Sequence, residues 1–183
     1  TAYDEAIVTV SDSLINSAVN VAICSGQTTT LNAGNAGSTY LWSTGATTAS
    51  ITVASQGTYT VTVTGTDGCS AVFNNQVNVN PLPLLQFTAS PLCFGSPTQF
   101  VNLSGIPSGS INSFYWSFGD GTTDTSANTS YQYPLAGTYN VSLVAVSASG
   151  CADSLTQQVT VHNIPDAKFA ANNVCKNIQT TFN

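Results

Sequence analysis

The chain has 183 residues, of which only 5% are charged, and 2 Lys and Arg against 8 Asp and Glu leave a formal net charge of -6. Nucleic acids and anionic membrane surfaces both require clustered Lys and Arg, so this composition excludes both as partners. No apolar run approaches the roughly 18 residues that span a bilayer. We therefore expect no direct membrane insertion, and we expect any export signal or anchor to lie outside this sequence.

One spacing recurs three times along the chain. A Val-x-Val pair is followed, after thirteen residues, by Cys24, Cys93 and Cys175. Residues 83–100 also align without a gap on residues 165–182. Fixed spacing of this kind indicates tandem domains. We predict the following divisions: 1–13, closing strand of a preceding repeat and linker; 14–82, an Ig-like repeat; 83–164, a second domain; 165–183, opening strands of a following repeat.

Strand signals appear in the same order in both repeats. The first repeat shows alternation at 51–53 and 57–64, and the second shows it at 113–118 and 137–143. Apolar residues alternate there with Thr, Ser or Asn, which predicts half-buried strands with one wet face. Clusters of turn residues separate these segments, and we find no amphipathic helix.

Four aromatic landmarks support a sandwich. Trp42 and Trp116 lie on equivalent central strands, and their strand parity assigns them to the core. Tyr59 and Tyr139 each follow a Gly-Thr and open a later strand. They are expected to pack inward and bond the backbone as in a tyrosine corner, the alternative being ordinary strand tyrosines. The predicted fold is all-β, with tandem immunoglobulin-like β-sandwiches in a repeat array.

Each complete repeat has one cysteine near its start and one late in its sequence. We predict one disulfide per repeat, Cys24 with Cys69 and Cys93 with Cys151, in an oxidising compartment. Zinc is the disfavoured alternative, because the chain has no Cys-x-x-Cys pair and one histidine.

The sequence lacks the usual catalytic constellations. The histidine, His162, lies beside a predicted domain junction, and no zinc-protease, nucleophile-elbow or nucleotide-binding motif is present. We therefore predict a protein that is not an enzyme and needs no organic cofactor. Asp120 and Asp124 are calcium candidates, since Ca²⁺ prefers several oxygen ligands from one loop. The simpler alternative is that these aspartates stabilise their own turns.

The second repeat resembles a known family. Trp116-Ser-Phe-Gly-Asp-Gly121, Tyr131-Gln-Tyr133 and Ala136-Gly-Thr-Tyr139 resemble the PKD (polycystic kidney disease) domain over about residues 83–164. Ser117, Gln132 and Ala136 replace a common Asp, His and Pro of that pattern. The first repeat, with Trp42-Ser-Thr-Gly-Ala-Thr-Thr48 and Asp67-Gly-Cys69, is similar to compact Ig-like and SprB-type repeats of large Bacteroidota surface proteins.

These resemblances imply an extracellular, cell-surface protein exported by a type 9 secretion system. We predict a non-enzymatic structural or adhesive segment of a long secreted protein, a stalk or filament that presents a distal binding element for cell adhesion. The alternatives are an accessory region of a secreted hydrolase and a direct glycan- or protein-binding module. Expected partners are neighbouring repeats, with lateral self-association and host or surface glycans and proteins as further candidates. Ser13 and Ser154 lie in Asp-Ser-Leu patterns that resemble a Bacteroidota O-glycosylation motif.

Overall fold

The computed structural model describes residues 14–15 and 18–168, and all the regular structure in these residues is β-strand. The all-β prediction is confirmed. The chain divides into two compact units. Unit 1 comprises Thr1–Leu82, Pro107–Gly109 and Ser149–Cys151, and unit 2 comprises Pro83–Ile106, Ser110–Ala148 and Ala152–Asn183. Two short turn segments of the second repeat are thus grouped with unit 1.

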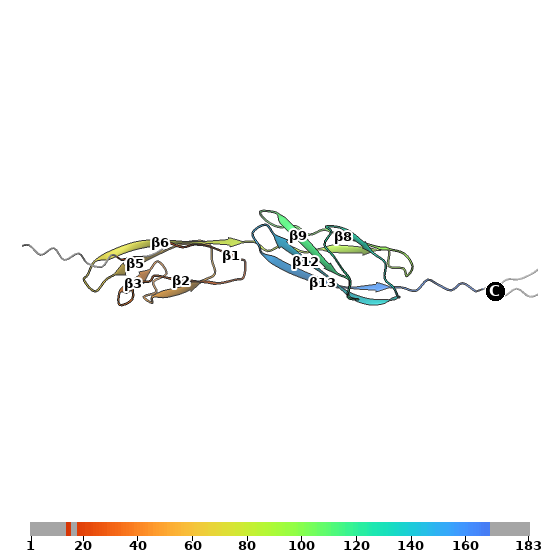
Figure 1. The fold of residues 1–183 in the computed structure, drawn as a ribbon, viewed down its shortest axis with the longest axis horizontal. Helices are drawn as coiled ribbons and strands as arrows, with labels where there is room; N and C mark the ends of the chain where they lie inside the picture. The colour runs from red at the N-terminus through yellow and green to blue at the C-terminus, as the bar shows by residue number, and fades with distance from the viewer. Residues whose placement is uncertain (1–13, 16–17, 169–183) are drawn as a thin grey trace, which may run out of the picture. The chain divides into compact units, whose positions relative to one another are not determined.

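Unit 1 is built from two sheets (Figure 1). Its strands are β1 (Asn20–Cys24), β2 (Thr29–Asn32), β3 (Thr39–Trp42), β4 (Ser50–Val53), β5 (Gly57–Thr64) and β6 (Ser70–Asn80). One sheet has the order β1-β6-β5-β3, and the other pairs β2 with β4. Strand β1 runs parallel to β6, whereas the other pairs are antiparallel.

The core of unit 1 follows the period-two pattern of its strands. In β5, Val61 and Val63 are fully buried, while Thr60 and Thr62 keep partial exposure. One face of the strand therefore packs inward and the threonine face meets solvent. The buried apolar residues are Ile23, Leu31, Ala33, Trp42, Ile51, Val53, Val61, Val63 and Val77.

Unit 2 is also built from two sheets (Figure 1). Its strands are β7 (Phe87–Ser90), β8 (Thr98–Asn102), β9 (Ile111–Ser117), β10 (Thr123–Asp124), β11 (Thr129–Tyr131), β12 (Gly137–Ser147) and β13 (Ala152–Val161). The sheet orders are β10-β9-β12-β13 and β11-β8-β7. Strands β12 and β13 form a long antiparallel hairpin, which pairs Gly137 with Val161 at one end and Val146 with Ala152 at the other.

Aromatic side chains fill the core of unit 2. Trp116 has no solvent exposure, and its ring lies 5.1 Å from Phe87 and 5.7 Å from Phe100 between centroids. Phe118 extends this cluster, with Phe100 at 5.2 Å and Tyr131 stacked on it at 4.3 Å. Large rings bury much apolar area and gain further from tilted and stacked contacts. Unit 2 therefore depends on these rings where unit 1 depends mostly on aliphatic residues.

The turn after Phe118 requires a glycine for two reasons. Gly119 has a φ of +86°, in the left-handed region. A Cβ at this position would lie 2.7 Å from the backbone oxygen of Asn140 and 2.9 Å from its nitrogen. Gly121, two residues later, has a φ of +96° but open space around its Cα.

Gly119→Ala is expected to destabilise unit 2 by at least about 3 kcal/mol, because left-handed strain and a backbone clash act together. Gly121→Ala is the matched control and should cost about 1 to 2 kcal/mol from strain alone. Urea unfolding followed by Trp116 fluorescence, in a Trp42→Phe background, measures both. Equal losses in the two variants would contradict the predicted clash with Asn140.

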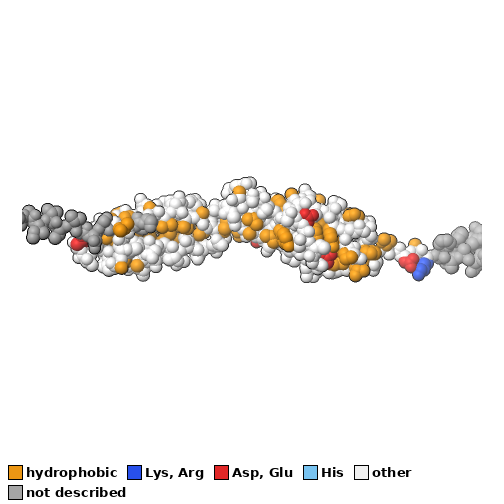
Figure 2. Space-filling view, viewed as in Figure 1, with side chains coloured by type: hydrophobic (Ala, Val, Ile, Leu, Met, Phe, Trp, Pro, Cys, Tyr) orange, Lys and Arg blue, Asp and Glu red, His pale blue; other side chains and the backbone are white. Residues whose placement is uncertain are grey.

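Charged side chains are sparse on the surface. In Figure 2 few side chains on the visible face of each unit are coloured as charged, and most of that face is backbone and other side chains with scattered hydrophobic ones. Thr, Ser, Asn and Gln must therefore provide most of the hydration. The described part of the chain contains no helix with the length and apolarity that a membrane span needs.

Candidate functional site

The two repeats place their early cysteines in similar turns, and we call Cys24 and Cys93 the leading cysteines. Cys24 ends β1, and the carbonyl oxygen of Cys24 accepts a hydrogen bond from Gln27 N at 2.9 Å. The backbone nitrogen of Cys24 donates in turn to Gln27 Oε1 at 3.1 Å. Gln27 was not among the predicted site residues, although its position three residues after the cysteine is the signal of such a local cap.

The late cysteines follow hairpin turns, and we call Cys69 and Cys151 the hairpin cysteines. Cys69 lies between β5 and β6 after Gly68, which has a φ of +83°. Cys151 lies between β12 and β13 after Gly150, which has a φ of +82°. The same Gly-Cys pair therefore ends the hairpin turn of both repeats.

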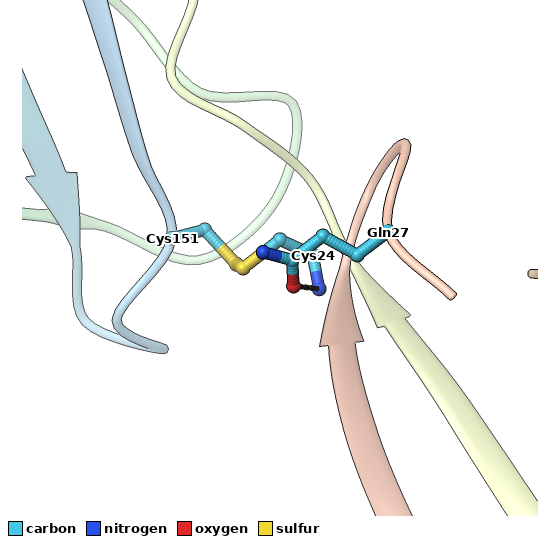
Figure 3. The surroundings of a disulfide bond; sticks show 3 residues. All are labelled: Cys24, Gln27 and Cys151. Atoms are coloured by element: carbon cyan, nitrogen blue, oxygen red, sulfur yellow. Dashed lines mark hydrogen bonds between the residues drawn. A yellow bond between two sulfur atoms is a disulfide. The ribbon is translucent and has the colours of Figure 1, made fainter. Parts of the chain in front are cut away.

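The disulfide of the structure joins Cys24 to Cys151, with a Cα–Cα distance of 5.6 Å (Figure 3). Both cysteines belong to unit 1 by their contacts, although Cys151 lies in the second repeat of the sequence. Cys151 is fully buried. The bond therefore connects the leading cysteine of one repeat to the hairpin cysteine of the next.

Both predicted pairs, Cys24 with Cys69 and Cys93 with Cys151, are wrong, because the observed bond takes one cysteine from each. Cys69 and Cys93 are exposed. The error has a simple cause. Both complete repeats carry one leading and one hairpin cysteine in the same order among their landmarks. This pattern alone therefore cannot distinguish pairing within a repeat from pairing across repeats.

The aromatic landmarks lie at equivalent places in the two units. Trp42 and Trp116 are buried, and their indole nitrogens donate to backbone oxygens at 2.9 and 3.0 Å. The hydroxyl groups of Tyr59 and Tyr139 each donate to the carbonyl oxygen four residues upstream, at 2.9 and 2.8 Å. This is the hydrogen bond of a tyrosine corner. The two tryptophans are thus not available for stacking on a sugar.

Asp120 stabilises the turn between β9 and β10. One carboxylate oxygen accepts from the backbone nitrogen of Thr122 at 3.0 Å and from its hydroxyl, and the other accepts from the hydroxyl of Tyr131. Burial acts to raise the pKa of Asp120, but these hydrogen bonds outweigh it and hold the pKa below its ordinary value. The hydrogen bond from Tyr131 to Asp120 raises the pKa of Tyr131.

Asp124 makes a second, separate set of hydrogen bonds. Its carboxylate accepts from the hydroxyl of Thr129 and from the backbone nitrogen of Ser126 at 2.8 Å. These bonds stabilise the ionised form, Thr129 first, and lower the pKa of Asp124 to about 2. The side-chain oxygen of the nearby Asn128 accepts from the backbone nitrogen of Asn102 at 2.8 Å.

The carboxylate of Asp124 is expected to titrate near pH 2 in the folded protein. Because its folded pKa is depressed, its contribution to stability is present above the ordinary pKa of 3.8 and is lost as pH falls through about 2. Thr129→Val should move the NMR titration midpoint up towards 3.8, whereas Thr123→Val, at an exposed neighbouring threonine, should not. An unchanged midpoint in Thr129→Val would disprove the assigned cause.

All four carboxylate oxygens of Asp120 and Asp124 already accept hydrogen bonds from the protein. We therefore expect about 10 mM Ca²⁺, which exceeds the dissociation constants of weak extracellular calcium modules, to leave the melting temperature of unit 2 unchanged. Differential scanning calorimetry with Ca²⁺ and with EDTA makes the measurement. A rise that Asp120→Asn or Asp124→Asn abolished would establish a calcium site instead.

The remaining candidates lie apart from these residues. His162 is exposed at the end of β13, where its backbone oxygen accepts from Phe94 N at 2.8 Å. Ser154 is exposed on β13, and its glycosylation stays a prediction. Ser13 and Cys175 lie outside the described residues. Among the described residues, no three His, Cys, Asp or Glu side chains gather as metal ligands would.

Residues 78–162 match the family model of the PKD domain. The predicted resemblance of the second repeat is confirmed. Collagenase ColA of Bacillus cereus is 40% identical over 86 residues, a match that covers 37% of this chain and 9% of that protein. The pre-pro-metalloprotease PrtV of Vibrio cholerae is 37% identical over 67 residues and is covered to 7%. The chain thus spans less than a tenth of these curated relatives.

A solved structure, the PKD1 domain of Vibrio anguillarum Epp, is 27% identical with a TM-score of 0.44. The match covers 47% of this chain and 99% of that one.

Proposed function

We propose that this chain is a non-enzymatic, load-bearing segment of a secreted cell-surface repeat protein, which holds a distal binding element away from the surface. The observation that carries the proposal is the disulfide between Cys24 and Cys151. Successive repeats joined only by a peptide linker need no such bond. A second covalent connection suits a segment that transmits tension.

The path of tension through the chain follows from covalent connectivity. A force on the two ends enters through residues 1–24, crosses the disulfide and leaves through residues 151–183. The intervening residues 25–150 form a closed loop that carries no tension. This loop contains β2 to β12, so most strands of both units are protected from mechanical unfolding while the disulfide is intact.

The surface composition and the disulfide support an extracellular location of the protein. Disulfides persist in oxidising compartments outside the cytosol. A surface with few charges and many short polar side chains is typical of exported proteins. Only 5% of the residues of this chain are charged. Cell-surface attachment, a Bacteroidota origin, type 9 export and the SprB-type character of unit 1 belong to the same proposal. Neighbouring repeats are its expected partners, with lateral copies of the chain and host glycans or proteins as further ones.

A deletion in the full-length protein tests this function. Residues 14–164 are replaced with a Gly/Ser linker of equal length, and a matched variant carries only Cys151→Ser. If the segment is a stalk, the linker variant should reach the surface in normal amounts but lose adhesion under flow. The Cys151→Ser variant should lose adhesion only at high shear. Unchanged adhesion of the linker variant under flow would overturn the proposal.

A second candidate function is supported by the relatives named above, a collagenase and a pre-pro-metalloprotease. In that case the segment is an accessory region of a secreted hydrolase. The same linker variant should then adhere normally. Relative to the unaltered protein, its rate on an insoluble polymeric substrate should fall more than its rate on a soluble one. The two readouts separate the two functions.

A further inference from the structure

We propose that Cys93 forms a disulfide with the hairpin cysteine of the repeat that begins at residue 165. The observed bond between Cys24 and Cys151 is then one member of a series, in which each leading cysteine binds the hairpin cysteine of the following repeat. This inference rests on the tandem-array part of the proposed function.

Cys93 occupies the same backbone environment as Cys24. Cys24 lies opposite Asn80 in the parallel pairing of β1 with β6, and Cys93 forms a parallel bridge with His162 at the end of β13. In both repeats the residue after the cysteine donates to that partner's carbonyl oxygen at 2.8 Å. The leading cysteine is therefore held beside the last strand of its own repeat, immediately before the chain leaves that repeat.

The turn that follows the cysteine is also reproduced. The carbonyl oxygen of Cys24 accepts from the nitrogen three residues later at 2.9 Å, and that of Cys93 accepts at 3.3 Å. Gly26 and Gly95, two residues after the cysteine in each turn, have φ values of +83° and +84°. Both cysteines thus stand at the start of the same glycine turn.

The path to the next repeat has the same length in both cases. Asn80 and His162 each precede a proline by three residues, at Pro83 and Pro165. From Pro83, the chain continues to the hairpin cysteine Cys151, which binds Cys24. From Pro165, residues 165–182 repeat the register of residues 83–100 without a gap. A third repeat would therefore place a hairpin cysteine as the disulfide partner of Cys93, as the second repeat places Cys151 for Cys24.

Cys93 is accessible for this reaction, because it is exposed, whereas Cys24 is half-buried with its bond formed. The two complete repeats place their hairpin cysteines 45 residues (69 minus 24) and 58 residues (151 minus 93) after the leading cysteine. The partner of Cys93 is accordingly expected about 45 to 58 residues after Cys175, preceded by glycine.

Bond formation requires a disulfide oxidant, such as a thiol–disulfide oxidoreductase in its oxidised form. The Cys93 thiol loses its proton, and the thiolate attacks one sulfur of the oxidant, whose other sulfur leaves as a thiolate. The thiolate of the partner cysteine then attacks the mixed disulfide at Cys93. The oxidant leaves as a dithiol, which takes up the two protons and carries the two electrons.

Peptide mapping of the full-length protein, digested without reduction after alkylation of free thiols, tests the inference. We expect one cross-linked pair that contains Cys24 and Cys151 and a second that contains Cys93 and a Gly-Cys hairpin of the next repeat. Alkylated Cys93, or Cys93 bonded within its own repeat, overturns the inference and leaves the stalk function standing. If no repeat follows residue 183, both the inference and the tandem array fail.

A tandem chain gives a second test that is independent of the natural flanking sequence. Residues 1–164 are followed by a second copy of residues 83–164, so that the copied Cys151 becomes the predicted partner of Cys93. We expect two cross-linked pairs in the oxidised chain, and only Cys24 with Cys151 in the matched Cys93→Ser variant. Loss of both links in Cys93→Ser, or a free Cys93 in the oxidised parent chain, contradicts the proposed series.

Discussion

Trp116→Ala is expected to lower the free energy of unfolding of unit 2 by about 3 to 5 kcal/mol, the usual cost of truncating a large buried aromatic side chain. Trp116 has no solvent exposure and contacts both Phe87 and Phe100. The substitution also removes the donor to Ser126 O, at 3.0 Å, and leaves that oxygen without its indole partner. A small domain has only about 5 to 15 kcal/mol in total, so unit 2 should be partly or wholly unfolded at 37 °C.

The neighbouring Tyr115 supplies the matched control. It lies on the opposite face of β9 and is 46% exposed. Tyr115→Ala should therefore cost less than about 1 kcal/mol, as surface substitutions usually do. Calorimetry and hydrogen exchange can follow unit 2 in the absence of its tryptophan, and the transition of unit 1 should stay unchanged in both variants. A similar loss in the two variants would show that the core does not depend on Trp116.

Breaking the disulfide is expected to change the mechanical response of the chain more than any other single covalent change. Cys24 and Cys151 are 127 residues apart in sequence. At about 3.5 Å per extended residue, the closed loop hides about 450 Å of contour length from a pulling force. Single-molecule stretching between the two chain ends should therefore release about 450 Å more length, in unfolding steps of both units, after reduction.

Cys151→Ser should reproduce the reduced behaviour without any reducing agent, since it removes one sulfur of the bond. Cys93→Ser is the matched control and should leave the oxidised response unchanged, because Cys93 takes no part in this disulfide. If the oxidised chain already released the full length of both units, the bond between Cys24 and Cys151 would not exist in solution. The load-bearing proposal would then lose its main support.

Local sequence was sufficient for many of the strands. The predicted segment 57–64 coincides with β5, because its Val and Thr residues alternate on a strand with one buried face. The predicted segment 137–143 is shorter than β12, which extends to Ser147. Pairing with β13 continues as far as Val146, so the partner strand maintains the extended backbone beyond the predicted end.

Other elements depend on contacts that local sequence does not contain. Strand β10 has two residues and β11 has three, and both exist because they pair with longer strands, β9 and β8. The role of Asp120 is of the same kind. Its contact with Tyr131 joins residues eleven positions apart, on opposite sides of a turn. Its part in the turn depends on hydrogen-bond donors that only the folded chain places around the carboxylate, and a calcium role stays a prediction.

The sequence by itself determined the repeat period, the all-β class and the inward-facing tryptophans, because spacing and period-two alternation are properties of the chain in order. The partners of the cysteines were decided by the tertiary structure alone. A disulfide needs two Cα atoms within about 4.4 to 6.8 Å, and spacing in a repeated sequence fits every pairing that preserves the register. Folding brings Cys24 to 5.6 Å from Cys151, and this distance selects the pairing across repeats.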